Sequence, residues 1–440
     1  MNWPVSIQRL FLIGAIVSLT VLLPAWAADS SSTEDLRQEI RELRDLAQKQ
    51  QTRIDELERK VNAGGVFRGV TLKPAENSSP MLAAPPSALP PVGAAAQSRP
   101  ISGQIGAVLP EIGAVGDIVA TSSQKRNDTE GNDRISAREL ELVVGSYVDP
   151  YSRFDSTIAF SDQADVELEE AYLTRWGLPG DVKARFGKFF PRVGKEASTH
   201  RDSLSTVDEP FVIRNFFGKE GFAKAGADLT RPFGGPFGWV LEPSLGVVEG
   251  GAGEGSVTFG SDHRRPTVYS HLKMFRELGD LSNLELGLTH LVGSKSSDNG
   301  FQVNVLGADA TYTYHVTPTN KLLLQSEVYV QDRGGDSSTD STTGAVTRFD
   351  QHPWGIYLLG DYRFAPRWSA GMRLDQVRPV DTAASRNLDQ GVSAFLTFYQ
   401  SEFARWRLQV RHETDADRKE DNAVFLQGTF AIGTHKHQLQ

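Results

Sequence analysis

The sequence contains no cysteine among its 440 residues, so no disulfide can stabilise the fold. A reducing cytosol permits that absence, and so does the cell envelope when a protein there avoids disulfides. The net charge of −9 argues against a nucleic-acid partner. Hydrophobic residues make up only 39% of the chain, which is low for a protein that lies in a bilayer as helices. Beyond the N-terminus no stretch is apolar enough to predict a spanning helix.

The N-terminal residues predict an exported protein. Arg9 precedes the apolar run Leu10–Leu23, and Ala25 and Ala27 then have A-x-A spacing. This pattern is typical of a secretory signal peptide, residues 1–27, cut after Ala27. An uncleaved membrane anchor is the alternative, but the run is shorter than the roughly 20 residues of a spanning helix. Any membrane insertion of the mature chain would therefore use strands.

Residues 28–62 have the heptad pattern of an α-helical coiled coil. Apolar side chains alternate by four and three residues, with charges between them and one polar layer at Gln50. The stretch RIDELE, 53–58, resembles the trimerisation motif of short coiled coils, whereas Ile at a with Leu at d favours a dimer. A single amphipathic helix packed on its own domain is the alternative. The residues assigned to trimerisation are Ile40, Leu43, Arg53, Ile54, Leu57 and Glu58.

Two further segments flank the main domain. Residues 63–110 contain eight prolines amid Ala, Gly and Ser, a composition that predicts an extended or disordered linker. Residues 435–440 form a C-terminal tail, whose His435 and His437 are explained more simply as exposed side chains than as metal ligands.

From residue 111 to 434 apolar and polar side chains alternate with a period of two, which predicts strands. Most candidates are longer than the strands of globular sheets and long enough to span a membrane when tilted. We expect an all-β fold, an antiparallel transmembrane β-barrel of about 16 strands preceded by the coiled coil. The expected strands are 111–122, 135–148, 151–161, 165–176, 181–190, 220–230, 238–248, 267–276, 282–293, 302–315, 321–331, 353–364, 367–377, 389–400, 404–413 and 421–433.

The connections between these strands alternate in length. Even-to-odd connections are short, such as TPTN and SEFA, whereas most odd-to-even connections are longer and polar, such as SSQKRNDTEGND and RPVDTAASRNLD. An outer-membrane barrel with both termini in the periplasm has short periplasmic turns and long outer loops. A soluble sandwich gives no reason for this alternation.

The stretch Ala404–Glu413 shows which face is which. Trp406, Leu408 and Val410 alternate with arginines and one glutamine. We assign the apolar face to lipid and the cationic face to a water-filled lumen, so that the barrel has no conventional core. Aromatic pairs beside the short turns agree with an interfacial belt. In a soluble barrel each pair could close its own hairpin, but the pairs would have no reason to share one side. The pairs are Tyr147 with Tyr151, Phe237 with Trp239, Tyr312 with Tyr314, Phe364 with Trp368, and Phe403 with Trp406.

The inward face carries charges of both signs, which predicts weak selectivity with basic strips that favour anions. Each residue is equally well explained as a solvated wall residue. Glu169 and Glu170 are adjacent, so we expect them on opposite faces of their strand, although strands four and ten look irregular enough for a β-bulge. The lumen-wall candidates are Lys183, Arg185, Lys273, Arg373, Arg405, Arg407 and Arg411, with His271 and the acidic Glu139, Glu141, Glu167, Glu169, Glu285, Glu327 and Asp375.

The longest connection, Pro191–Lys219, is the third on the outer side. Its apolar end FVIRNFF predicts that it folds inward and narrows the pore. His200 with Asp202 offers only two metal ligands, a weak signal without a third, so we predict neither a metal nor a cofactor. The candidate constriction residues are Arg192, Lys195, Glu196, His200, Arg201, Asp202, Asp208, Glu209 and Arg214.

Together, the coil, the linker, the strands and the inward loop resemble trimeric bacterial outer-membrane porins. Within residues 111–434, the stretches ARFGKFFPRVG (184–194) and NFFGKEGFAKAGADL (215–229) are similar to the phosphate-selective porin O/P family. The resemblance implies a homotrimer and phosphate selectivity through a lumenal arginine ladder and a lysine cluster. Arg405, Arg407 and Arg411 would belong to that ladder, and the interleaved Glu139, Glu141 and Glu285 depart from the pattern.

The expected function is passive diffusion of small hydrophilic solutes, with anion preference, through the outer membrane of a Gram-negative bacterium, with the coil in the periplasm. Its partners would be the lipid bilayer, further copies of the chain and the solutes or anions. The alternative is a structural protein that tethers the envelope through the coil. An enzyme is disfavoured, since no nucleophile elbow, H-E-x-x-H or phosphate-binding glycine loop is present. A TonB-type transporter is disfavoured because residues 63–110 are too short and proline-rich for a folded plug.

Overall fold

The structure is a computed structural model that describes residues 110–124, 133–162, 166–219, 221–251, 258–259, 264–295, 302–339, 346–380 and 388–433. The predicted signal peptide, the coiled coil with its six trimerisation residues, all of the linker except residue 110, and the tail lie outside these residues. Within the described part, no helix has the length and apolar character needed to cross a membrane.

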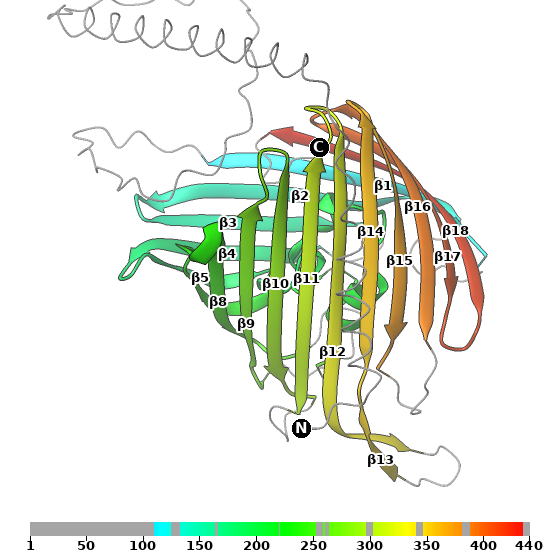
Figure 1. The fold of residues 1–440 in the computed structure, drawn as a ribbon. Helices are drawn as coiled ribbons and strands as arrows, with labels where there is room; N and C mark the ends of the chain where they lie inside the picture. The colour runs from blue at the N-terminus through cyan, green and yellow to red at the C-terminus, as the bar shows by residue number, and fades with distance from the viewer. Residues whose placement is uncertain are drawn as a thin grey trace, which may run out of the picture. The chain divides into compact units, whose positions relative to one another are not determined.

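Sixteen strands form one closed antiparallel barrel (Figure 1). β1 pairs with β18 from Gly113 opposite Gly433 to Ser123 opposite Ala423, and this pairing closes the ring. The ring consists of β1 (Glu111–Ser123), β2 (Arg134–Asp149), β3 (Ser152–Phe160), β4 (Glu167–Leu178), β5 (Val182–Phe189), β6 (Lys224–Thr230), β8 (Val240–Val248), β9 (Thr267–Glu277), β10 (Ser282–Gly293), β11 (Val303–His315), β12 (Lys321–Thr339), β14 (Trp354–Ala365), β15 (Trp368–Arg378), β16 (Asp389–Ser401), β17 (Ala404–Thr414) and β18 (Glu420–Gly433).

Two short strands belong to connections and do not enter the ring. β7 (Phe233–Gly234) and the 3₁₀ turn η3 (Pro236–Gly238) lie between β6 and β8, which pair directly with each other. β13 (Val346–Gln351) pairs with the far end of β12. The prediction of about 16 strands is therefore confirmed, and most strand bounds agree with it to within two residues.

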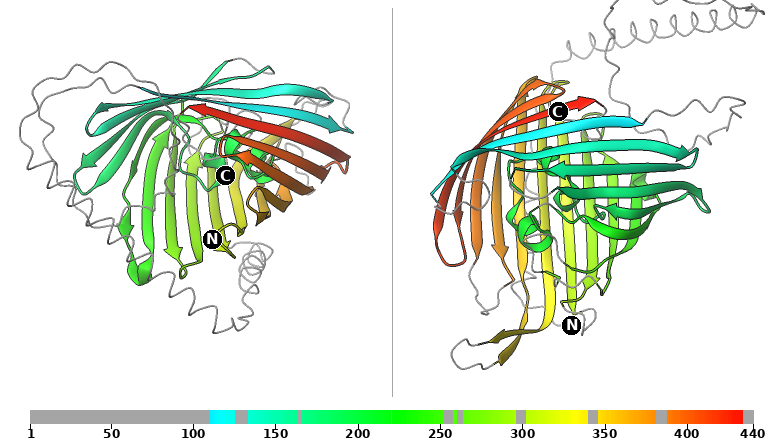
Figure 2. Two further views of the ribbon diagram at one scale, coloured as in Figure 1. Left: turned by 90° about the horizontal axis from the view of Figure 1, so that it is seen from above. Right: turned by 180° about the vertical axis from the view of Figure 1, so that it is seen from behind.

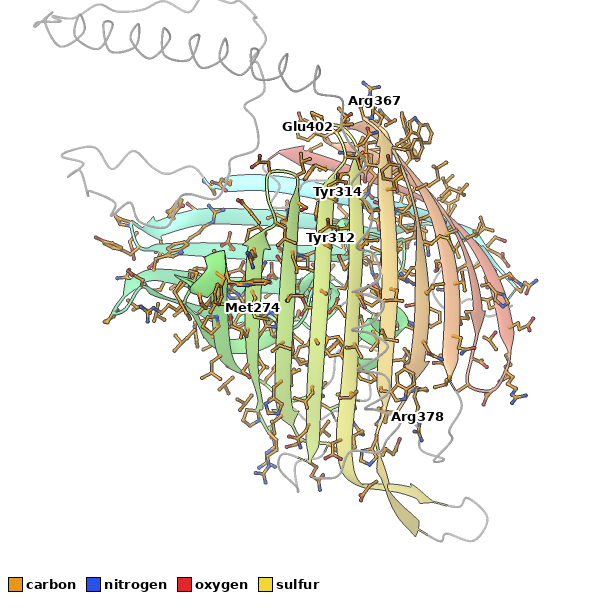
Figure 3. All side chains as sticks on the ribbon, in the orientation of Figure 1. Met274, Tyr312, Tyr314, Arg367, Arg378 and Glu402 are labelled. Atoms are coloured by element: carbon orange, nitrogen blue, oxygen red, sulfur yellow. The ribbon has the colours of Figure 1, made fainter. Side chains whose placement is uncertain are left out.

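The two ends of the barrel differ in their connections, as the sequence predicts. Arg367 and Glu402 lie in short turns at one end, whereas Arg378 lies at the other end, where the longer connections begin (Figure 3). Tyr151, Phe237 and Phe403 are exposed beside the short turns. These aromatic side chains lie at that end, as expected for an interfacial belt.

Alternation along β17 separates the two faces of the sheet. Trp406, Leu408 and Val410 are 38–48% exposed, whereas Arg405, Arg407 and Arg411 are at most 7% exposed. Other strands repeat this arrangement, with exposed Leu140, Leu288, Leu358 and Leu374 on the outer face. An apolar outer face with a polar inner one is the reverse of a soluble protein and suits a lipid surround.

The inner face nevertheless encloses a hydrophobic core, so the prediction of no conventional core is wrong. The helix α3 (Phe211–Phe217) packs its apolar side chains mainly against β14 and β15, and it belongs to one apolar cluster that includes inward-facing residues of β5, β8–β12 and β14–β16. One contact is the edge-on pair of Phe217 and Tyr329, whose ring centroids are 5.0 Å apart. Each fully buried large apolar side chain contributes about 1.5–3 kcal/mol. The cluster therefore holds the segment between β5 and β6 inside the barrel.

β-Bulges change the faces of two strands. The β1–β2 register skips Arg138, and the β3–β4 register skips Glu169. A bulge re-aims the side chains beside it, and Glu169 and Glu170 are consequently both buried. The prediction that these two face opposite sides is wrong, and the suspected irregularity of strand four is the reason. Strand ten, now β11, pairs without any shift, so the suspicion of a bulge there is also wrong.

Candidate functional site

The connection between β5 and β6, residues 190–223 and hereafter the β5–β6 segment, lies on the inner side of the strands (Figure 2). It contains the 3₁₀ turns η1 (Glu196–Ser198) and η2 (Arg201–Ser203) and the helix α3. Pro210 precedes the helix and Gly218, at φ 109°, ends it. Most of the polar contacts that attach the segment to the wall lie at three places, which involve β10 and β12, then β2 and β4, and then β15 and β17.

At the first place, the carboxylate of Glu327 on β12 accepts hydrogen bonds from the start of the segment. The backbone N–H groups of Lys195 and Glu196 donate to it at 3.0 and 2.7 Å. The hydroxyls of Tyr329 and Tyr357 also donate to it, each at 2.8 Å. With four donors, this buried acceptor is well satisfied and fixes the backbone of the segment.

Glu196 lies beside this acceptor and accepts from Gln325 Nε2 at 2.6 Å. Burial, reinforced by the charge of Glu327, raises the pKa of Glu196 to about 7. The same stretch of the segment places Lys195 Nζ 2.8 Å from Glu285, which also pairs with Lys273 at 2.7 Å. Two lysines therefore share one carboxylate at this place.

At the second place, His200 enters a group of wall glutamates. Its Nε2 is 3.1 Å from Glu170, and its Nδ1 is 3.3 Å from Glu169 and 3.7 Å from Glu141. Burial by itself would lower the pKa of His200, but the carboxylates, led by Glu141, raise it well above its ordinary value. Our sequence prediction pairs His200 with Asp202 and misses Glu170, because only the bulge in β4 turns both glutamates inward.

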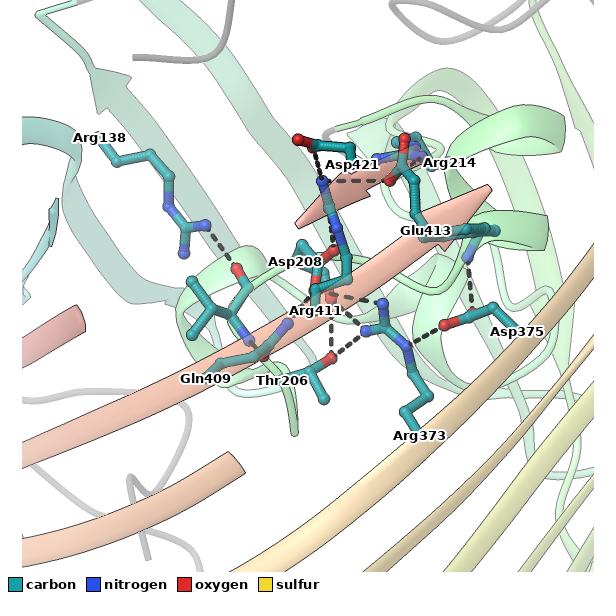
Figure 4. Close-up of polar contacts among 12 residues, drawn as sticks. Arg138, Thr206, Asp208, Arg214, Arg373, Asp375, Gln409, Arg411, Glu413 and Asp421 are labelled. Atoms are coloured by element: carbon teal, nitrogen blue, oxygen red, sulfur yellow. Dashed lines mark hydrogen bonds and ion pairs between the residues drawn. The ribbon is translucent and has the colours of Figure 1, made fainter. Parts of the chain in front are cut away.

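At the third place, Asp208 is held by two arginines of the wall (Figure 4). Arg373 Nη2 lies 3.2 Å from it and Arg411 Nη1 2.6 Å, while Gln409 donates at 2.6 Å. Burial alone would raise the pKa of Asp208, yet these guanidinium groups hold it below its ordinary range. Arg373 also pairs with Asp375 at 2.7 Å and donates to Thr206.

The backbone of the segment is held by neighbouring arginines. Arg405 donates to the Asp202 carbonyl and Arg407 to the Leu204 carbonyl. Together with Arg373 and Arg411, these arginines are buried. Four of the seven basic residues that the sequence assigns to the lumen wall therefore contact the β5–β6 segment.

The remaining candidates are more dispersed. Lys183 is half-buried near the start of β5, and Arg185 pairs with Asp228 at 2.5 Å. Arg192 and Arg201 pair with Glu242 and Glu209 at 2.9 and 3.0 Å, and Arg214 approaches Glu413 at 3.9 Å. Sequence analysis missed Asp228, Glu242 and Glu413, although each falls at an alternating polar position of its strand.

No family model matches the chain. An uncharacterised protein of Aquifex aeolicus (strain VF5) is 26% identical over 328 residues, which cover 67% of this chain and 68% of the relative. The solved structure of an anion-selective porin from Comamonas acidovorans has a TM-score of 0.50 at 10% identity and covers 73% of this chain and 99% of that one. The outer membrane channel DcaP of Acinetobacter baumannii has a TM-score of 0.47 at 14% identity, with 74% and 97% covered.

At these identities the likeness concerns the fold alone. The closed ring of 16 antiparallel strands is the fold of bacterial outer-membrane porins.

Proposed function

We propose that the protein is an outer-membrane porin through which small hydrophilic solutes diffuse passively, with a preference for anions, and that the β5–β6 segment narrows its pore. The observation that carries this proposal is a closed barrel with an apolar outer face and a charged inner face. Sixteen strands enclose a lumen wide enough for an aqueous channel. A segment packed within that lumen leaves a narrower path for solutes.

The anion preference is supported by the inward cations that keep contact with water. The side chains of Lys195 and Lys273 are 38% and 40% exposed, and both form ion pairs with the single carboxylate of Glu285. Lys183 is half-buried on β5, which β6 and β8 separate from β9 in the ring. A partly hydrated surplus of positive charge attracts anions without binding them tightly. We assign selectivity to these lysines, and we propose that the phosphate preference implied by the resemblance to the O/P family would act through them.

The orientation and assembly are also part of the proposal. The short turns would face the periplasm, as would the coil of residues 28–62. Three copies would associate through the residues listed for trimerisation, from Ile40 to Glu58. Removing residues 29–62 is expected to yield a monomeric barrel by analytical ultracentrifugation in detergent, and an unchanged trimer would contradict the role of the coil.

The direct test is single-channel conductance of the purified protein in a planar bilayer under a salt gradient. We expect the conductance to rise in discrete steps, and we expect a reversal potential whose sign shows that anions cross more easily than cations. The double variant Lys195→Gln/Lys273→Gln should reduce that potential, whereas Lys419→Gln, at an exposed turn between β17 and β18, should not. A folded, heat-modifiable barrel without conductance would overturn the porin proposal and favour a tethering role for the coil.

A further inference from the structure

Five acidic side chains gather around His200 where the β5–β6 segment meets β2 and β4. Glu139 and Glu141 come from β2, Glu169 and Glu170 from β4, and Asp202 from the segment. All six residues are at most 7% exposed. Such a surplus of buried carboxylates over cations is costly unless protons or a bound cation compensate for it.

The geometry around the imidazole defines one set of ligands. One nitrogen or oxygen atom from each of Glu141, Glu169 and His200 lies within 4.8 Å of the other two. Nδ1 of His200 faces the two carboxylates, while Nε2 lies 3.1 Å from Glu170. An ionised carboxylate only accepts, so Nε2 carries the proton of this hydrogen bond. Metal binding releases the proton on Nδ1, because a histidine ligand is neutral, and Nδ1 then presents its lone pair on the side of Glu141 and Glu169.

This arrangement is the one found at metal-binding histidines, in which an outer carboxylate orients the ring. A second observation points the same way. Glu141 Oε1 and Glu139 Oε2 are buried and have no hydrogen-bond partner in the part of the chain that the structure describes, and Glu169 Oε2 faces only Nδ1 of His200 at 3.3 Å. Buried carboxylate oxygens normally have partners, and a cation between the three side chains would supply one.

The bulge in β4 brings two of these groups to the same face. A regular strand would turn one of Glu169 and Glu170 outward to lipid. The bulge at Glu169 instead provides one glutamate on each nitrogen side of His200. Bulges that re-aim side chains often occur at functional sites.

We propose that Glu141, Glu169 and His200 bind one divalent transition-metal ion of the Zn²⁺ class, with Glu170 as the positioning residue for His200. An imidazole with carboxylates suits Zn²⁺, whereas Ca²⁺ and Mg²⁺ prefer oxygen ligands alone. Three protein ligands leave a fourth position for water or Glu139. The ion links the β5–β6 segment to β2 and β4, and its binding is independent of whether the barrel conducts.

The test measures metal content of the folded full-length chain, in a His435→Ala/His437→Ala background that removes the tail histidines. After dialysis against a chelator and then against Zn²⁺, elemental analysis should find about one Zn²⁺ per chain. His200→Ala and Glu141→Gln/Glu169→Gln should lose it. Glu170→Gln should weaken binding by about 10- to 100-fold without abolishing it. His271→Ala, which removes another buried histidine of the barrel, should retain it.

Heat-modifiable migration verifies that each variant folds, and Co²⁺ substitution provides a ligand-field spectrum that reports on the nitrogen ligand. If Ca²⁺ or Mg²⁺ displaced the bound Zn²⁺ when added at a similar concentration, the proposed ligand chemistry would be contradicted. A folded parent chain that takes up no zinc, or a His200→Ala variant that binds as much as the parent, would overturn the site. Conductance plays no part in these readouts, so failure of the metal site and failure of the porin proposal are distinguishable.

Discussion

Two groups of inward-facing cations differ in how much water reaches them. On β15 and β17, Arg373, Arg405 and Arg407 are buried beneath the β5–β6 segment and bond to it. Opposite them, Lys195 and Lys273 remain more than one-third exposed. The strand pattern places both groups on the inner face, so their different roles come from what covers them. The buried arginines anchor the segment, and under the proposed function the exposed lysines are the cations that solutes would meet.

The largest expected effect comes from removing an anchor. Arg373→Met leaves Asp208 and Asp375 without their shared cation, and breaking such a buried pair costs about 3–5 kcal/mol. We expect the amides of residues 190–219 to lose protection in hydrogen exchange while the strands keep theirs. Arg175→Met, which breaks an exposed pair with Asp149, is the matched control and should change little. Unchanged protection in Arg373→Met would show that the arginines are not anchors.

A pH effect of similar or smaller size is expected at the opposite attachment. The pKa of Glu196 is raised from 4.5 to about 7, so between these pH values the folded segment holds a proton that the detached segment releases. The free energy that holds the segment should therefore fall as pH rises from about 4.5 to about 7, by at most about 3 kcal/mol.

Hydrogen exchange of the same amides, compared at each pH with Glu196→Gln, measures this change. The variant keeps the shape of the side chain but does not ionise, so its protection should vary less with pH. Parallel pH profiles for the two proteins would rule out Glu196 as the group responsible.

A smaller effect separates the two groups of cations in function. Arg405→Gln/Arg407→Gln/Arg411→Gln should loosen the segment and raise the conductance or its noise, because contacts to Asp202, Leu204 and Asp208 are lost. Lys195→Gln/Lys273→Gln should instead lower anion preference several-fold at nearly constant conductance. Both are measured in planar bilayers. If the arginine variant loses anion preference at constant conductance, the arginines line the path and the assignment of roles is reversed.

Period-two alternation and the lengths of the connections were enough to predict the barrel. In β17 the alternation of Trp406, Leu408 and Val410 with arginines identifies the two faces, because each residue of a strand points opposite to its neighbours. The turn residues and the aromatic pairs are likewise recognised from residues close together in the chain. Those signals depend on neighbours in the chain, so sequence analysis could use them.

The candidate site depended on contacts between distant residues. His200 meets Glu141 and Glu169 because the segment folds back across the lumen, and the bulge in β4 brings Glu170 to the same face. A bulge reverses the faces of all residues beyond it, and no local pattern fixes its position. The hydrophobic core around α3 also depends on distant residues, because its described members come from nine strands of the wall.

The sequence by itself thus determined the number of strands, the outward and inward faces of those without a bulge, and the two unequal ends of the barrel, since these follow from local backbone geometry. Only the tertiary structure decided which inward charges are covered, which carboxylates meet His200 and where apolar side chains form a core. The reason is physical: burial and electrostatics depend on what the β5–β6 segment packs against, and its partners are up to about 200 residues away in the chain.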